Sequence, residues 1–171
     1  MRFLDKSESN QAALKLTGRT KNHNEPEFVL YYTSGRTDYE KASNTIAKSI
    51  GNFDVAFLHC IDLIFGDGVR DGVKTDERWQ PFYRWRRYLG EPRRLYHTPG
   101  HQFDSNEATL LQQTLVWTFE LGWDACLFAN PGRCHLFFSH NDRVEIFRVR
   151  EKRKLVRNLE KLEFHQAGGR Q

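Results

Sequence analysis

The segment from Asp104 to Trp123 constrains the fold more than any other part of the chain. Seven apolar residues recur in it at helical spacing on two sides, namely Ala108, Leu111, Leu115 and Phe119, then Leu110, Trp117 and Leu121. Asp104 and Glu107 supply a capping pair at its start. Because a helix that is apolar on two sides is packed on two sides, this segment is predicted to be the central helix of the core.

Three apolar segments follow this helix, at Asp124–Asn130, Arg133–His140 and Arg143–Val149. The Pro131-Gly132 and Asn141-Asp142 pairs between them are typical of tight turns. The sequence therefore predicts a three-stranded antiparallel meander over residues 124–149 with helices packed on it, which is an α+β fold. Residues 27–33, which are rich in aromatic and branched side chains, are expected to add a further strand.

Other elements follow from the same periodicity. The spacing of apolar residues predicts three further helices, at residues 39–50, 81–89 and 150–164. Thr37 and Glu40 fit a capping box before the first of them. Residues 53–65 are apolar almost throughout, which fits a buried strand or a buried helix, and their length favours a helix. Residues 93–103 show no regular pattern and are predicted to form an irregular loop.

A chain of 171 residues is of the size of one domain. We expect a polar N-terminal arm at residues 1–26, a single globular domain at residues 27–165 and a flexible tail at residues 166–171. No window approaches the ~18 uninterrupted apolar residues that cross a bilayer, and no apolar signal segment follows the first residues. Three cysteines are too few for a disulfide framework. These features predict a cytoplasmic protein that does not enter a membrane.

Positive charge is concentrated in two segments, although the formal net charge is only +4, from 26 Lys and Arg against 22 Asp and Glu. Residues 84–94 hold five arginines against Glu91, and residues 148–157 hold six basic residues against Glu151. Such clusters attract polyanions or acidic protein surfaces, although a solvated face is the simpler alternative for each. The residues that we expect to bind a partner or nucleic acid are Arg84, Trp85, Arg87, Arg93, Arg94, Arg150, Arg153, Lys154 and Arg157, with His97 and His101 as loop candidates.

The two basic segments differ in pattern. On a helix over residues 150–164, five cations share one side and leave the other side apolar: Arg150, Arg153, Lys154, Arg157 and Lys161. In residues 78–88, arginines alternate with aromatic residues, a mixture that single-strand nucleic-acid binders and protein interfaces both use. The spacing of Phe82, Trp85 and Leu89 favours a different interpretation, in which the rings anchor the core and the arginines extend outwards.

No pattern in the sequence fixes a catalytic or metal-binding site. His97 and His101 have the spacing of two ligands on a helix, but Pro99 and Gly100 lie between them, so we expect no metal. The three cysteines lie in apolar runs, where burial raises the pKa of a thiol and makes it unreactive. The acids around His140 show no spacing that defines a catalytic set. We expect no cofactor, and an enzyme is left open but not favoured.

The order of elements in residues 104–149, a helix, then Gly122-Trp123-Asp124, then a meander, resembles small bacterial immunity and accessory domains. This resemblance implies a regulator of another protein. With the charge pattern, it favours a non-enzymatic interaction module that presents a basic face to an acidic protein partner. The alternative is a nucleic-acid-binding or nuclease-associated protein that uses the same Arg and aromatic face, and self-association is left open in both cases.

Overall fold

The computed structural model describes residues 1–17, 25–62, 77–129 and 134–166. Its strands are β1 (Arg2–Leu4), β2 (Phe28–Tyr31), β3 (Val55–Asp62), β4 (Gly100–Asp104), β5 (Asp124–Ala129), β6 (Cys134–Ser139), β7 (Arg143–Arg148) and β8 (His165–Gln166). Its α-helices are α1 (Lys6–Thr17), α2 (Tyr39–Ile50), α3 (Gln80–Tyr88), α4 (Ala108–Glu120) and α6 (Lys152–Glu160), and a short 3-10 helix covers Glu77–Trp79.

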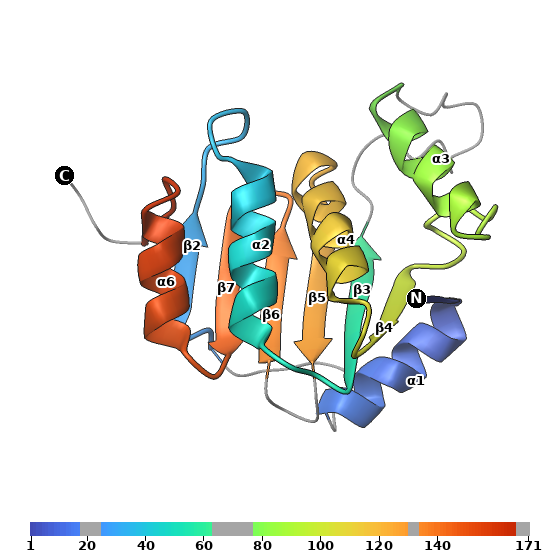
Figure 1. Cartoon of the computed structure of the whole chain (residues 1–171), viewed down its shortest axis with the longest axis horizontal. Coiled ribbons are helices and arrows are strands. Elements are labelled where there is room, and N and C mark those ends of the chain that lie inside the picture. The colour runs from blue at the N-terminus through green and yellow to red at the C-terminus, as the bar shows by residue number, and fades with distance from the viewer. Residues whose placement is uncertain (18–24, 63–76, 130–133, 167–171) are drawn as a thin grey trace.

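The strands form one open antiparallel sheet in the order β1-β4-β3-β5-β6-β7-β2-β8 (Figure 1). The α+β class expected from the sequence is confirmed. The sheet, however, has eight strands rather than three, and β5, β6 and β7 are neighbours in its middle. The further strand expected at residues 27–33 is β2, which pairs with β7 on one side and with β8 on the other.

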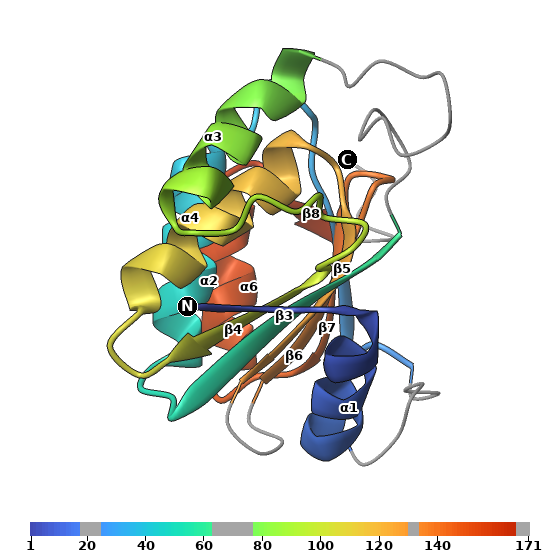
Figure 2. The same cartoon turned by 90° about the vertical axis from the view of Figure 1, so that its right-hand side faces the viewer.

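Helices cover both faces of the sheet. Figure 2 shows α2, α4 and α6 on one face and α1 on the other. The main core fills the space beneath the three helices, with Leu58, Leu127 and Leu136 of the sheet all fully buried. A smaller cluster lies under α1, where Leu4 and Phe57 are at most 2% exposed. No helix in the described ranges is long and apolar enough to cross a bilayer.

The predicted helix at residues 53–65 is wrong, because residues 55–62 form the strand β3. Alternate side chains of β3 enter different cores: Ala56 and Leu58 face the helices, and Phe57 faces α1. A strand covered on both faces has no polar side, so its sequence lacks the alternation that identifies a half-exposed strand. Residues 63–65 lie outside the described residues.

Residues 1–26, expected to be a polar arm, contribute β1 and α1 to the domain. The backbone of β1 pairs with β4, with Phe3 opposite His101. The start of α1 has a reciprocal capping box, in which Glu8 N donates to Asp5 Oδ1 at 2.9 Å and Asp5 N donates to Glu8 Oε2 at 3.0 Å. The Asp5-x-x-Glu8 spacing was the sequence signal for this helix.

Several further boundaries differ from the sequence predictions. The helix expected from Asp104 begins at Ala108 without a side-chain cap, and the helix expected at residues 150–164 is the shorter α6, Lys152–Glu160. The loop expected at residues 93–103 ends in β4 from Gly100 onwards. The cap of α2 is Asp38 rather than Thr37, because Asp38 Oδ1 accepts from Lys41 N at 2.9 Å. Gln166, expected to begin the tail, belongs to β8. The rest of the expected tail, residues 167–171, and the turn expected at residues 130–133 lie outside the described residues.

Candidate interaction surfaces

The helix α6 is fixed to the domain along one side. Leu155, Val156 and Leu159 are at most 3% exposed and belong to the main core. α6 also contacts α2, its neighbour in the helical layer (Figure 1). Because the apolar residues occupy this side, the basic residues at the intervening positions are directed to solvent.

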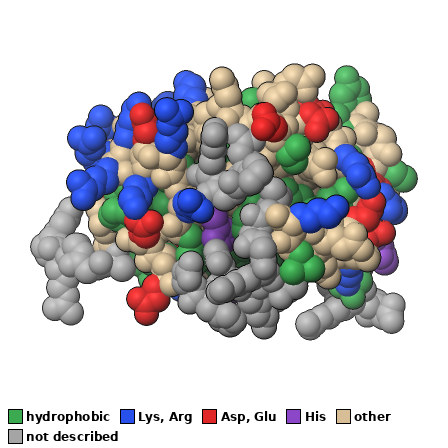
Figure 3. Space-filling model, turned by 90° about the horizontal axis from the view of Figure 1, so that it is seen from below, with side chains coloured by type: hydrophobic (Ala, Val, Ile, Leu, Met, Phe, Trp, Pro, Cys, Tyr) green, Lys and Arg blue, Asp and Glu red, His purple; other side chains and the backbone are tan. Residues whose placement is uncertain are grey.

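The outward side of α6 and the residues at its two ends carry exposed cations, which we call the α6 surface: Arg150, Arg153, Lys154, Arg157 and Lys161. Seen from below, Lys and Arg side chains gather at the end of the molecule where α6 lies (Figure 3). Lys154 is paired with Glu151 at 2.8 Å. Within the part of the chain that the structure describes, no ion pair involves any of the other four cations. The α6 surface therefore keeps most of its positive charge.

Three carboxylates near α6 have partners within the fold. Glu27 pairs with Lys152, which lies at the start of α6. Glu160 accepts a hydrogen bond from Gln166 Nε2 at 2.6 Å. Glu151 also interacts electrostatically with Arg150, and the neutral amide of Gln166 leaves the negative charge of Glu160 in place, so these acids offset part of the positive charge of the α6 surface.

The helix α3 is anchored by aromatic rings. Trp79, Phe82 and Tyr83 are each at most 8% exposed and belong to the main core. Trp85 is half-buried, its ring centroid lies 5.9 Å from that of Phe82, and its Nε1 donates to Gln113 Oε1 at 3.3 Å. Trp85, which the sequence predicts to be a binding residue, thus makes most of its contacts within the fold.

Opposite these rings, α3 presents Arg84, Arg87 and Tyr88 to solvent, and we call these three residues the α3 platform. They occupy positions i, i+3 and i+4 of one helix, so they share a side. Tyr88 is 87% exposed, more than any other large hydrophobic side chain among the described residues. Arg84 and Arg87 are the two members of the predicted binding set that α3 leaves exposed.

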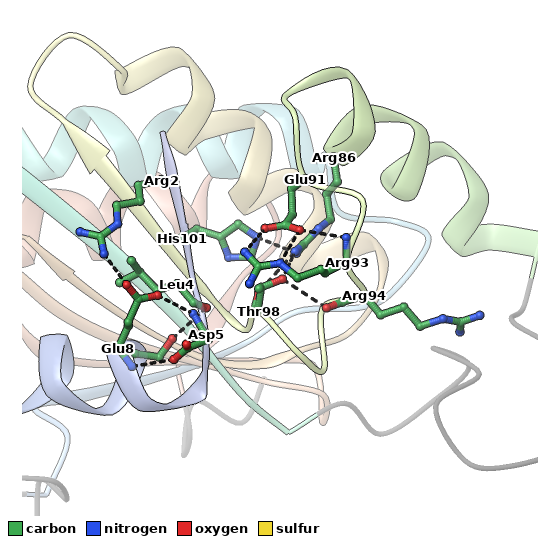
Figure 4. Close-up of polar contacts among 11 residues, drawn as sticks. Arg2, Leu4, Asp5, Glu8, Arg86, Glu91, Arg93, Arg94, Thr98 and His101 are labelled. Carbon is green, nitrogen blue, oxygen red and sulfur yellow. Dashed lines mark hydrogen bonds and ion pairs between the residues drawn. The ribbon is translucent and has the colours of Figure 1, made fainter.

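One arginine of α3, which the sequence predictions did not single out, is directed inwards (Figure 4). Arg86 is fully buried. Its Nη1 lies 3.2 Å from His101 Nε2, and its Nη2 donates to the hydroxyl of Thr98 and, at 3.4 Å, to the Thr98 carbonyl. The available signal was its position, because Arg86 follows the core residue Phe82 by four, which places both on the same side of the helix.

The two histidine candidates lie in different environments. His101 belongs to β4 and is fully buried, and burial, followed by the positive charge of Arg86, holds its pKa well below the usual value. His101 is therefore neutral, and its Nε2 is the acceptor for Arg86. His97 is exposed in the loop, with its ring 5.5 Å from that of Tyr96 in an edge arrangement. The structure does not bring the two histidines together as a site.

Arg93 and Arg94 also differ. Arg93 forms a two-pronged contact with the buried Glu91, Nε to Oε1 at 2.9 Å and Nη2 to Oε2 at 2.7 Å. Although burial opposes it, the hydrogen bonds from Arg93 hold the pKa of Glu91 below its usual value. Arg94 is exposed and its side chain extends away from this cluster (Figure 4). The charge of Arg93 is thus neutralised within the fold.

The closest approach to a catalytic arrangement is a histidine and an aspartate at the β6–β7 turn. His140 Nδ1 lies 2.9 Å from Asp124 Oδ1, which also accepts from His140 N at 2.9 Å. Among the described residues, no hydroxyl or thiol forms a hydrogen bond with His140, and burial raises the pKa of Cys126 and Cys134 to about 12. Across the same ranges, no group of three or more His, Cys, Asp or Glu side chains is placed to hold a metal ion.

The single basic face expected from the sequence is therefore wrong, because the exposed binding candidates on α3 and α6 lie on two separate surfaces. α6 lies at one end of the helical layer and α3 at the other, with α2 and α4 between them (Figure 1). The α6 surface is cationic only, whereas the α3 platform combines two arginines with an exposed ring. The chain matches no known protein-family model, no curated protein and no solved structure, so these surfaces must be interpreted from their own chemistry.

Proposed function

We propose that the protein is a non-enzymatic interaction module that binds an acidic protein partner through the α6 surface. The observation that carries this proposal is the row of exposed cations, of which Arg150, Arg153, Arg157 and Lys161 have no ion pair among the described residues. Like charges at helical spacing repel each other by about 0.2–0.5 kcal/mol per pair. A partner that carries carboxylates would relieve this repulsion.

The anchoring of α6 supports the same proposal. Its apolar side is held by Leu155, Val156 and Leu159 in the main core, so the arginines project from a fixed backbone. A preorganised surface loses little conformational entropy when it binds. Arginine in particular offers a planar fork that pairs with carboxylates through two hydrogen bonds.

A direct test is titration of a fluorescent polyglutamate peptide with the full chain at low and at physiological salt. We expect binding that weakens with salt, because rim charges act through screened electrostatics. The double variant Arg153→Glu and Arg157→Glu is expected to weaken binding more than tenfold. The matched control is Arg84→Glu with Arg87→Glu, which changes the net charge equally on the other surface and is expected to leave peptide binding within about twofold.

Two outcomes contradict the proposal. Equal loss of peptide binding in both double variants would indicate a response to net charge and not to the α6 surface. Binding of a duplex oligonucleotide through the α6 surface, without binding of polyglutamate, would replace the protein partner by nucleic acid. Thermal melts of each variant, followed by circular dichroism, confirm that the substitutions leave the fold intact.

A further inference from the structure

Tyr88 is the most exposed large hydrophobic side chain among the described residues. Its ring is 87% exposed, although single exposed aromatic residues are common on protein surfaces and carry no meaning alone. What distinguishes it is its setting, since Arg84 and Arg87 lie on the same side of α3. Among the described residues, no ring or cation occupies either face of Tyr88.

The surroundings of Tyr88 are cationic. No residue of α3 is acidic. Glu91, which follows the helix, is buried and bonded to Arg93, so it does not neutralise the exposed arginines. The α3 platform therefore offers two guanidinium groups beside an open aromatic face.

The platform also rests on a fixed base. Phe82 and Tyr83 anchor the inner side of α3 in the main core, and Arg86 ties the same side to His101 of β4. The exposed residues of the platform alternate along the helix with these buried ones. The relative positions of ring and cations are thus set before any ligand arrives.

From these observations we propose that the α3 platform binds single-stranded nucleic acid, with a base stacked on Tyr88 and phosphates contacted by Arg84 and Arg87. Single-strand binders combine a cationic track along the backbone with rings on which bases stack. Guanidinium groups suit phosphate oxygens because they donate paired hydrogen bonds. The platform is separate from the α6 surface, and its test does not depend on the proposed function.

The ring favours nucleic acid over an acidic protein at this surface. Carboxylates on a protein partner could pair with arginines without an exposed ring, as proposed for the α6 surface. A planar base uses the open face of Tyr88 as well as the charge of the two arginines.

The test compares two labelled strands of equal length by fluorescence anisotropy, a single-stranded oligothymidylate and an abasic strand with the same phosphates. We expect the full chain to bind the oligothymidylate about tenfold or more tightly than the abasic strand, because only the first can stack. Tyr88→Ala is expected to remove this preference and Tyr88→Phe to keep it. Arg84→Glu with Arg87→Glu is expected to abolish binding of both strands.

The control is Arg153→Glu with Arg157→Glu on α6, which is expected to leave oligothymidylate binding unchanged. Equal affinity for the two strands, or no effect of Tyr88→Ala, would overturn the proposal because stacking would be absent. Binding of a polyglutamate peptide in competition with the oligonucleotide at the α3 platform would overturn it in favour of an acidic protein. Since Tyr88, Arg84 and Arg87 are exposed, these variants are expected to fold.

Discussion

Arg86 and His101 lie 3.2 Å apart in the interior, Nη1 to Nε2, although each carries positive charge in its protonated form. The contact is stable because His101 is neutral and accepts a hydrogen bond from the guanidinium. It joins α3 to β4 through their side chains. The outward residues of α3 are therefore held in place by a polar contact inside the domain.

Replacement of Arg86 by Met is expected to lower the free energy of unfolding by about 2–4 kcal/mol, because His101 and Thr98 lose their buried donor. Urea denaturation followed by tryptophan fluorescence measures the loss. The control is Arg87→Met, an exposed position one residue further, where a change within about 0.5 kcal/mol is expected. Equal losses at the two positions would mean that the buried contact contributes nothing specific.

Stability is expected to fall as the pH drops below about 6.5, the usual pKa of histidine in an unfolded chain. Burial lowers the pKa of His135 to about 4, and that of His59 and His101 also lies below the usual value. Between the folded and unfolded pKa values of each histidine, the unfolded chain binds a proton that the folded chain does not. The free energy of unfolding therefore falls by at most ~1.4 kcal/mol per pH unit for each such proton.

The pH effect can be assigned with His135→Gln, since His135 is stacked between Phe128 and Phe147 at 4.8 and 4.4 Å. Urea midpoints at pH 7, 6, 5 and 4.5 are expected to show a shallower pH dependence in this variant than in the wild type. The exposed His97→Gln is the control for the substitution itself. Parallel curves for the wild type and His135→Gln would refute the assignment.

Gly100→Ala is expected to loosen the N-terminal segment. A methyl group at Gly100 would lie 2.9 Å from both Leu4 Cβ and Phe57 Cε2 and would press on Ser9 Oγ. Overpacking of this kind lowers the free energy of unfolding by about 1–3 kcal/mol. The strain falls at the contacts of β1 and α1 with the sheet. Hydrogen exchange in residues 2–15 is expected to accelerate. Gly35→Ala, a position in open space with a φ of +79°, is the control and is expected to leave exchange in α1 unchanged.

The thiols of Cys126 and Cys134 are expected to resist thiol reagents in the folded protein, because burial raises the pKa of each to about 12 and leaves little thiolate at neutral pH. Reaction with a chromogenic disulfide reagent at pH 8 is expected to become fast only after denaturation in guanidinium. Rapid labelling of either residue in the native state, located by mass spectrometry, would contradict this expectation.

Local sequence patterns correctly predicted the helices in which buried apolar residues and exposed residues lie on separate sides. The apolar stripes of residues 104–123 correspond to α4, and the outward cations of residues 150–161 follow from the burial of Leu155, Val156 and Leu159. In both cases helical periodicity alone separates the inner from the outer side. The turn at Asn141-Asp142 was equally readable, since Asp142 adopts a φ of +54°.

The sequence pattern did not predict elements whose structure depends on pairing with residues far away in the chain. β1 and β4 are short and contain Arg, His, Gln and Gly, so they become strands only because β3 supplies a paired neighbour for β4. The separation of α3 from α6 and the inward direction of Arg86 also arise from tertiary packing. A count of clustered arginines cannot distinguish a buried guanidinium from an exposed one.

The outermost strands of the sheet are also its shortest, β1 with three residues and β8 with two. The unpaired backbone N–H and C=O groups of an edge strand can pair with a strand of another molecule, and a short edge strand limits such association. Deleting residues 1–4 would make the five-residue β4 an unpaired edge strand and is expected to promote association between molecules. Expression variants trimmed at the amino end should therefore be less soluble than the full chain.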